Sequence, residues 1–561
     1  MFRRRIVVAL AVASVSALFG AATPARAGAL EDGKRLLDDR RYEAAADAYR
    51  KVLKTSAGNR DAMFGLAKAV SDGKLGPDAY QEVEGLLRER LKAAADDRQA
   101  RLALGDLFLA WVFADDRYRA DAQDQFQKLA TADPKDADAA VGLARVYWIA
   151  GDTKHGMELL DEFLGRNPTS AGALHGKGAI LYADGANLFR AEQLSDNVKS
   201  LFARAAGAFE AATKADPKRK DSWMQLAYAN QYLAGVEPAR GTVAADAYEQ
   251  ALALDGDDLA PLRGLAALLA PKPDVWASTL ERVGKAFPKA PAVLFFQAEA
   301  AKAAGKLDAA EAGYKAYIAG TKAPALGWAS LGDLLDAKPD AEGATKAYHK
   351  SLELDPDSWR AASIVAKLLG AVNAKAEESW ADAAKAHKLL DAYRALAALA
   401  PTNRAVRNDG GFFCREAYAK SGKRDAALLK ASVELYVAAS DLIPEYREWY
   451  EQSIPYNDRH VYAQILNDTG LMFQYEPANL NLATAEAYYK KAMEWTQFGY
   501  WDAYGNLMKI YAAQSRWKEA YDFAASCAEG IKKEDGTPNQ TFRATCAAAR
   551  DQLEAKLPKD K

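Results

Sequence analysis

The chain has 561 residues, half of them hydrophobic and 27% charged, which excludes general disorder and leaves either several globular domains or one extended array. The 74 lysines and arginines nearly cancel the 76 acidic residues, and a net charge of −2 excludes binding of nucleic acid through an excess of positive charge. Three cysteines and five histidines exclude a disulfide scaffold and leave little material for a metal site.

The N-terminus predicts a cleaved secretory signal peptide. Residues 3–5 are arginines, residues 6–19 form an apolar run, and alanines at positions 25 and 27 precede a cut before Gly28. The alternative is a membrane anchor, but this run is shorter than the ~20 residues that span a bilayer. Removing residues 1–27 takes four arginines and no acidic residue from the net charge of −2, which leaves −6. We expect a periplasmic or secreted bacterial protein.

A pattern with a period near 34 residues organises the rest of the chain. Pro134 and Pro168, which close two copies, lie 34 residues apart, and Pro288 and Pro356 lie 68 apart, which is two periods. The two copies with the clearest spacing carry Trp328, Leu331, Gly332, Leu335, Ala344, Tyr348 and Pro356, and Leu143, Ala144, Tyr147, Gly156, Leu160 and Pro168. The regular spacing predicts one repeated structural unit.

Each copy of the pattern predicts two helices. The first carries apolar residues at i, i+3 and i+7, which is one stripe of a helix. A break follows, as at Gly151 and Gly305, and the second helix begins after it. A small residue such as Ala344 is expected where the two helices cross, because a larger side chain would force them apart. Pro356 closes its copy, since proline cannot continue a helix.

These marks resemble the tetratricopeptide repeat, whose pattern is W-x2-L-G-x2-Y, then A-x3-F, then P. The resemblance implies an all-α, right-handed superhelical solenoid of antiparallel helix pairs, with about twelve units. We expect a signal peptide (1–27), an N-terminal and central array (28–400), aromatic-rich C-terminal units (401–540) and a capping helix with a tail (541–561). The 49 residues from Pro168 to Pro217 exceed one period and predict an insertion.

Few residues offer reactive chemistry, and we predict no catalytic, metal or cofactor site. Cys414 fits a buried structural thiol, because no histidine lies near it in sequence. Cys527 and Cys546 lie almost symmetrically about a break at residues 535–538, on two helices that should run antiparallel. They are predicted either to form a disulfide in an oxidising compartment or to pack as two separate small residues.

The resemblance implies a concave groove, lined by the first helices, that holds a peptide or a partner's helix. The positions expected to face it are Lys34, Asp106, Arg145, Tyr228, Glu299, Asp333 and Lys509. These residues mix charges and include no asparagine, so they depart from the subfamily that clamps a chaperone's C-terminal carboxylate with Asn, Lys and Arg.

The C-terminal third predicts a second contact surface. Between residues 441 and 520 aromatic residues number 16 of 80, twice the chain's average of 10%. Adjacent pairs at 449–450 and 500–501 cannot both point inward on one helical face. Trp449, Tyr500 and Trp501 are therefore predicted to contact a partner, since exposed aromatic rings anchor protein interfaces.

The preferred interpretation is an exported, non-catalytic scaffold that mediates protein–protein interaction in the cell envelope. The alternative is an accessory module that binds cell-wall or exported polysaccharide through the same aromatic rings. An enzyme with an unrecognised site is the third and least supported interpretation.

Overall fold

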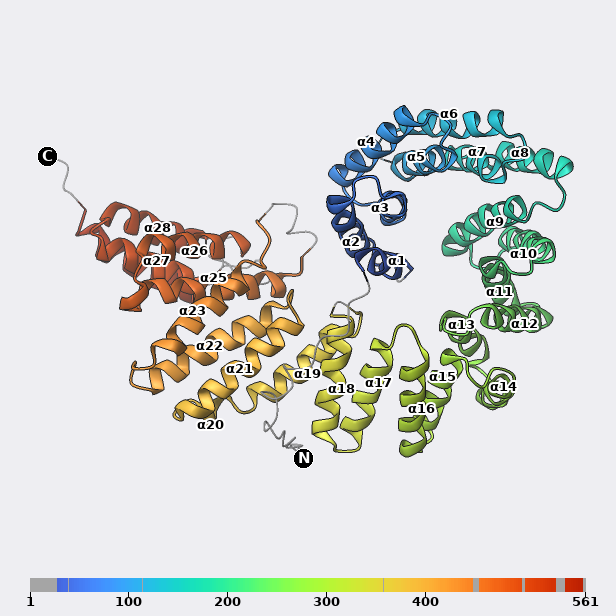
Figure 1. Ribbon diagram of the computed structural model, residues 1–561. Helices are drawn as coiled ribbons and strands as arrows, with labels where there is room; N and C mark the ends of the chain where they lie inside the picture. The colour runs from blue at the N-terminus through green and yellow to red at the C-terminus, as the bar shows by residue number, and fades with distance from the viewer. Residues whose placement is uncertain are drawn as a thin grey trace. The chain divides into compact units, whose positions relative to one another are not determined.

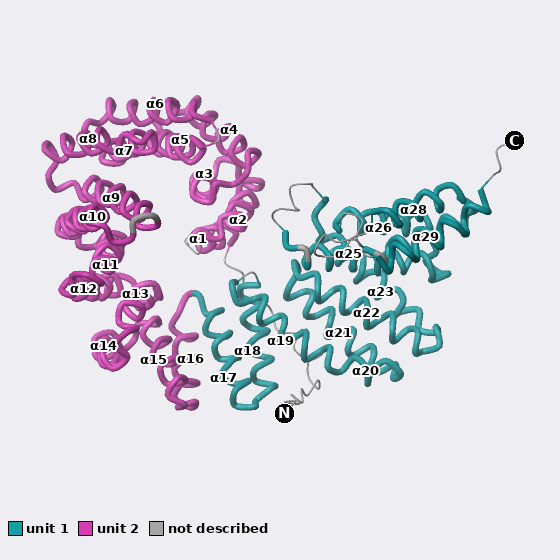
Figure 2. The backbone as a smooth tube through the Cα atoms, turned by 180° about the vertical axis from the view of Figure 1, so that it is seen from behind, with its two compact units in different colours: residues 1–11, 323–561 teal, residues 12–322 magenta. Residues whose placement is uncertain are grey.

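The computed structural model describes residues 28–38, 40–113, 115–356, 358–446, 454–496, 500–530 and 540–557, and these residues contain helices but no strand. The predicted signal peptide and its cleavage before Gly28 concern residues 1–27, which lie outside this part of the chain. The described residues divide into two compact units, 28–322 (unit 2) and 323–557 (unit 1) (Figure 2). The predicted change of character at 400/401 falls inside unit 1.

Unit 2 consists of eight helix pairs joined by short turns. In chain order they are α1 (Ala29–Asp38) with α2 (Tyr42–Thr55), α3 (Arg60–Gly73) with α4 (Pro77–Ala93), α5 (Arg98–Trp111) with α6 (Arg117–Ala132), α7 (Ala137–Ile149) with α8 (Thr153–Arg166), α9 (Ala171–Glu192) with α10 (Asp196–Ala215), α11 (Lys220–Ala234) with α12 (Pro238–Leu254), α13 (Ala260–Leu269) with α14 (Pro273–Ala286), and α15 (Pro291–Ala303) with α16 (Leu307–Gly320).

The described residues of unit 1 form five more pairs and a last helix. They are α17 (Ala325–Ala337) with α18 (Ala341–Leu354), α19 (Ala361–Asn373) with α21 (Ala383–Leu399), α22 (Arg404–Lys420) with α23 (Ala426–Ser440), α25 (Tyr456–Gln474) with α26 (Leu482–Trp495), α27 (Trp501–Ala513) with α28 (Trp517–Gly530), and α29 (Gln540–Glu554). The short α20 (Ala376–Ser379) and the 3-10 turn η2 (Pro477–Asn479) lie between helices. The predicted all-helical solenoid of helix pairs is confirmed.

Local sequence explains where the helices begin and end. Asn59, Asp97 and Asp136 cap first helices by accepting hydrogen bonds from backbone N–H groups of the first turn. The breaks between paired helices contain Gly151 and Gly305 with φ of 82° and 73°, a left-handed conformation that glycine adopts without strain. Both positions are the breaks that the sequence predicts.

In several pairs, an aromatic side chain of the second helix packs against glycines of the first helices. The Tyr49 ring of α2 fits between Gly33 of α1 and Gly65 of α3, where an added Cβ would lie 2.7 and 2.3 Å from ring atoms. The Phe126 ring of α6 fits in the same way between Gly105 and Gly142 of α5 and α7. The second helix is thereby fitted between two consecutive first helices, which is how neighbouring repeats share one core.

The residues expected to form an insertion between Pro168 and Pro217 instead lengthen the helices. α9 has 22 residues and α10 has 20, against 13 and 14 in the preceding pair. The added turns bury Val198, Phe202 and Leu233 in a separate cluster, where Phe202 stacks on Tyr232 with ring centroids 4.5 Å apart. The extra length therefore carries its own hydrophobic core and needs no inserted element.

The last helix is joined covalently to the array. The sulfur atoms of Cys527 on α28 and Cys546 on α29 form a disulfide, with the two Cα atoms 5.8 Å apart, and both residues are fully buried. This pairing is the first of the two possibilities raised by the sequence. It fixes α29 over the hydrophobic core that α25 to α28 share.

Candidate functional site

The first helices of unit 2 line the inner side of its curve. α5, α7, α9, α11 and α13 lie on this side, and α6, α10, α12 and α14 lie on the outer side (Figure 1). Lys34, Asp106, Arg145, Tyr228 and Glu299 are all carried by first helices of this unit. Asp333 and Lys509 are carried by first helices of unit 1. The sequence therefore placed all seven predicted groove residues on the expected class of helix.

Two of the predicted residues meet. Arg145 Nη1 donates to Asp106 Oδ1 at 2.6 Å, which links α7 to α5. One turn further along α7, Trp148 Nε1 donates to Asp184 of α9 at 2.5 Å. We call Asp106, Arg145, Trp148 and Asp184 the polar strip of unit 2. The polar strip joins three consecutive first helices. The side chains of Asp106 and Arg145 are each about two-fifths exposed.

Other predicted groove residues are engaged within their own pairs. Glu299 accepts a hydrogen bond from the Tyr314 hydroxyl at 2.7 Å. The ring of Tyr228 packs edge-on against Tyr248, and burial raises the pKa of its hydroxyl. Lys34 is ion-paired with Glu31 of the same helix at 3.2 Å. These contacts give Glu299 and Tyr228 a structural role, and partner binding by them stays a prediction.

Asp333 is the centre of an ion-pair network in unit 1. Its carboxylate accepts hydrogen bonds from the Tyr348 hydroxyl at 2.8 Å and from Lys367 Nζ at 2.9 Å, and it contacts Arg360. Burial alone would raise the pKa of Asp333, but these hydrogen bonds outweigh it and hold the pKa below its usual range. Burial raises the pKa of Tyr348 to about 12. The network joins α17, α18 and α19, and Asp333 stays ionised at neutral pH.

Sequence reasoning missed several polar contacts between first helices of unit 1. Asn506 Nδ2 of α27 donates to Asn467 Oδ1 of α25 at 3.0 Å, and both residues are buried. Asn373 Nδ2 of α19 donates to Asp409 Oδ2 of α22 at 2.7 Å. The pattern that marks a first helix was a leucine before a small residue. In α25, Thr469 stands where the leucine is expected, so the sequence did not show which residues of this helix face the neighbouring first helices.

One of the three aromatic residues expected on a contact surface in the C-terminal third is buried. Tyr500 is only 7% exposed and its ring packs edge-on against His460, so the expectation of an exposed anchor there is wrong. Trp495 is 2% exposed and contacts the rings of Tyr446 and Tyr462. The rings turn inward because they fill the junctions between pairs. Trp449 lies outside the described residues.

Trp501 is the first residue of α27, and its side chain lies outside what the structure describes. Lys509, eight residues further along α27, is exposed and has no ion pair with a described residue. It is the predicted groove residue in unit 1 whose charge stays open to a partner.

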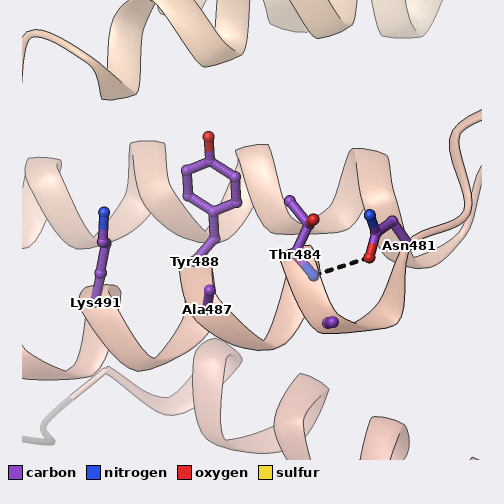
Figure 3. A pocket seen from close by; sticks show the side chains of 6 residues that line it. Asn481, Thr484, Ala487, Tyr488 and Lys491 are labelled. Carbon is purple, nitrogen blue, oxygen red and sulfur yellow. Dashed lines mark hydrogen bonds between the residues drawn. The ribbon is translucent and has the colours of Figure 1, made fainter.

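A shallow hollow runs along α26 in unit 1 (Figure 3). It is lined by Asn481, Ala483, Thr484, Ala487, Tyr488 and Lys491. The Asn481 side chain accepts a hydrogen bond from the backbone N–H of Thr484 at 3.1 Å and so caps the helix. The Tyr488 ring stacks on Phe473. Because one helix and its cap supply the whole lining, the hollow does not enclose a ligand.

The Cys414 thiol and the Ser222 hydroxyl, two groups with nucleophilic chemistry, are buried in the core. Burial raises the pKa of the Cys414 thiol to about 12, so the thiolate does not form at neutral pH. His175 Nδ1 lies 3.0 Å from Ser222 Oγ, but Ser222 is fully buried and a substrate cannot approach it. The described residues include no group of three His, Cys, Asp or Glu side chains that could hold a metal ion. None of their helices is both long and apolar enough to cross a membrane.

No protein-family model matches the chain, and no curated protein matches it in sequence. Among solved structures it is similar to yeast Tom70, with 12% identity, 94% of this chain and 95% of that chain covered, and a TM-score of 0.23. It is also similar to the complex described as Naa15/Naa10 bound to HypK-THB (14% identity, 94% and 98% covered, TM-score 0.31). A third similar structure is YrrB, described as a TPR protein with an unusual peptide-binding site. It is 17% identical, 42% of this chain and 96% of that chain are covered, and the TM-score is 0.22. These TM-scores are too low to support an argument. The fold assignment therefore depends on the helix packing described above, which is tetratricopeptide-like.

Proposed function

We propose that this protein is an exported, non-catalytic adaptor of the bacterial cell envelope that binds a protein or peptide partner. The observation that carries the proposal is the polar strip of unit 2. Arg145 and Asp106 meet across two first helices at 2.6 Å while both stay partly exposed on the inner side of the curve. Such a strip can exchange its internal ion pair for contacts with the polar groups of an extended peptide.

Export is supported by two independent features of the chain. Residues 1–27 have the order of charges, apolar residues and small residues that a secretory signal has. The disulfide between Cys527 and Cys546 persists in an oxidising compartment and is uncommon in a reducing one. A non-catalytic role is supported by the burial of Cys414 and Ser222.

Photo-crosslinking in bacterial cells tests partner binding. A photoreactive residue placed at Arg145 should give discrete adducts with a partner, and the same residue at Arg166, an exposed position of the second helix α8, is the matched control. Arg166 is paired only with Glu162 of its own helix, so its replacement leaves the inner side unchanged. Adducts at Arg145 that disappear when Asp106→Lys is added support the proposal. Equal adducts at both positions, or none at either, contradict it.

Fractionation tests export. Mass spectrometry of the protein from the periplasmic fraction or the medium should find a mature N-terminus at Gly28. Replacing the arginines at positions 3–5 with aspartate should leave the precursor in the cytoplasm, because the positive end of the signal orients it for export. An intact Met1 in the exported fraction would show that the leader is not cleaved.

Binding of cell-wall or exported polysaccharide remains the alternative function. It depends on exposed aromatic rings in the C-terminal third. Tyr500 and Trp495 are buried there, and the side chains of Trp449 and Trp501 lie outside the described residues.

A further inference from the structure

The polar strip of unit 2 ends in a carboxylate that no described cation neutralises. Asp184 Oδ1 accepts a hydrogen bond from Trp148 Nε1 at 2.5 Å, and an indole N–H is a neutral donor. In the part of the chain that the structure describes, Asp184 Oδ2 accepts no hydrogen bond, and no lysine, arginine or histidine pairs with Asp184. Asp184 therefore has one acceptor oxygen open to a donor from another molecule.

Two other carboxylates between consecutive first helices are neutralised. Asp106 of α5 accepts a hydrogen bond from Arg145 of α7 at 2.6 Å. In unit 1, Asp333 of α17 accepts one from Lys367 of α19 at 2.9 Å. The polar strip carries two carboxylates and one guanidinium, which leaves an excess of one negative charge. Because Arg145 is paired with Asp106, that excess lies at Asp184.

The geometry of α7 turns the indole toward the inner side of the curve. Gly142 of α7 faces the Phe126 ring of α6, which is an outer helix (Figure 1). Trp148 follows Gly142 by six residues, which is about 240° around the helix axis, so it lies on the side away from α6. Trp148 and Asp184 are both partly exposed. A partner inside the curve can therefore reach the indole and the carboxylate.

We propose that Trp148 and Asp184 bind one basic side chain, lysine or arginine, of the protein partner. We call these two residues the cation subsite. The inference rests on the proposed function, since it names the chemistry of the partner that the polar strip receives. A charged N–H group completes the hydrogen bonding of Asp184 Oδ2, and such a charge-assisted hydrogen bond is about twice as strong as one between neutral groups.

The Trp148 ring adds to the preference for a basic side chain. The face of an indole attracts cations, and the methylene stem of lysine or arginine packs on such a ring. The hydrogen bond to Asp184 orients both side chains before a partner binds, which reduces the entropy that binding costs. An organic cation fits better than a metal ion, because the described residues contain no group of three side chains that could hold one.

Fluorine NMR of the mature chain labelled with 5-fluorotryptophan tests the cation subsite. The resonance of Trp148 is the one that disappears in Trp148→Phe. The probes are two Gly-Ser peptides of equal length, one with spaced lysines and the other with glutamines at the same positions. At about 150 mM salt, exposed charges more than ~8 Å apart are screened. The lysine peptide should shift the Trp148 resonance saturably, and the glutamine peptide should bind at least about tenfold more weakly.

Variants assign the binding to Asp184. Asp184→Asn removes the charge but keeps an oxygen that can accept the Trp148 N–H, so the melting temperature should stay close to that of the wild type. Binding of the lysine peptide should weaken by about tenfold or more. Glu162→Gln removes the same charge from an exposed position of the second helix α8 and should leave binding unchanged. The comparison of the two peptides on the wild type needs no variant, so a misfolded variant does not remove the test.

The outcomes separate this inference from the proposed function. Equal shifts with both peptides, no shift with either, or lysine binding that survives Asp184→Asn overturns the cation subsite. Partner adducts at Arg145 are scored independently. Adducts without a lysine-specific shift overturn the cation subsite alone. A lysine-specific shift without adducts supports the cation subsite and contradicts the proposed function.

Discussion

Single residues set how close the helices come. Gly142 of α7 faces Phe126, and a Cβ at this position would lie 2.4 Å from the ring. The backbone of α7 can pack against the ring only because glycine has no side chain. Gly207 in the exposed part of α10 is different, since nothing lies within 4 Å of an added Cβ. Two glycines in helices of the same unit therefore have opposite requirements.

Gly142→Ala should destabilise unit 2 by about 1–3 kcal/mol, because the overpacked ring must move. Gly207→Ala should stabilise it by up to about 1 kcal/mol through helix propensity alone. Urea-unfolding midpoints measure both. A Gly142→Ala protein as stable as the wild type would show that Phe126 is free to move, contrary to the structure.

Glu486 on α26 makes stability depend on pH. Burial alone would raise its pKa, but hydrogen bonds from Arg516, Lys490 and Tyr511 outweigh burial and lower the pKa to about 2, from an ordinary value of 4.5. A carboxylate with a lowered pKa stabilises the fold above its unfolded pKa, and the stabilisation is lost as the pH falls from about 4.5 to about 2.

Melting temperatures of the wild type and Glu486→Gln between pH 2 and pH 6 test this. The wild type should be the more stable protein near pH 6, and its advantage should shrink as the pH falls through this window. If the melting temperatures of the two proteins differed by the same amount at every pH, ionised Glu486 would not stabilise the fold.

At the scale of helices, polar residues connect one pair to the next. Arg98, at the start of α5, donates to Asp136 at 2.7 Å, and Asp136 caps α7 while only 6% exposed. Arg60 and Asp97 repeat the arrangement one pair earlier. Each cap is thus fixed by a cation from the preceding pair, which aligns consecutive first helices.

The disulfide acts on one helix at the end of the array. Joining Cys527 to Cys546 closes a loop of 19 residues, which stabilises the folded state by about 3 kcal/mol in the chain-entropy model. Cys527→Ser with Cys546→Ser should raise hydrogen exchange in α29, residues 540–554, because α29 is then held only by packing. Exchange in α22 and α23, several helices away, should not change.

The control is Cys414→Ser, which removes a thiol that forms no disulfide. Its effect should be centred on α22. Exchange of α29 that is the same in the wild type and the double variant would show that packing alone holds the last helix.

At the scale of the molecule, the cores are local. α25 to α29 share one hydrophobic cluster, and α1 to α7 share another. In an array whose pairs contact only their neighbours, stability is the sum of local contributions. A weakened pair should therefore unfold without unfolding distant pairs.

Leu507→Ala tests this locality. Leu507 is fully buried in the cluster of α25 to α29, and its truncation should cost about 2–5 kcal/mol. Hydrogen exchange should rise over residues 454–557 and stay unchanged over residues 28–166. A uniform rise along the chain would instead show one cooperative fold.

The sequence by itself determined the helix pairs and the breaks at Gly151 and Gly305, and it named Cys527 and Cys546 as possible disulfide partners. These depend on residues close together in the chain, on the 3.6-residue period and on symmetry about one break. It also placed Asp106 and Arg145 on first helices. Only the tertiary structure decided which side chains stay open to a partner. It buried Tyr500, engaged Glu299 and Asp333 with tyrosines, and joined Cys527 to Cys546. Each of those outcomes depends on a contact with a residue of another helix, and one sequence does not contain that information.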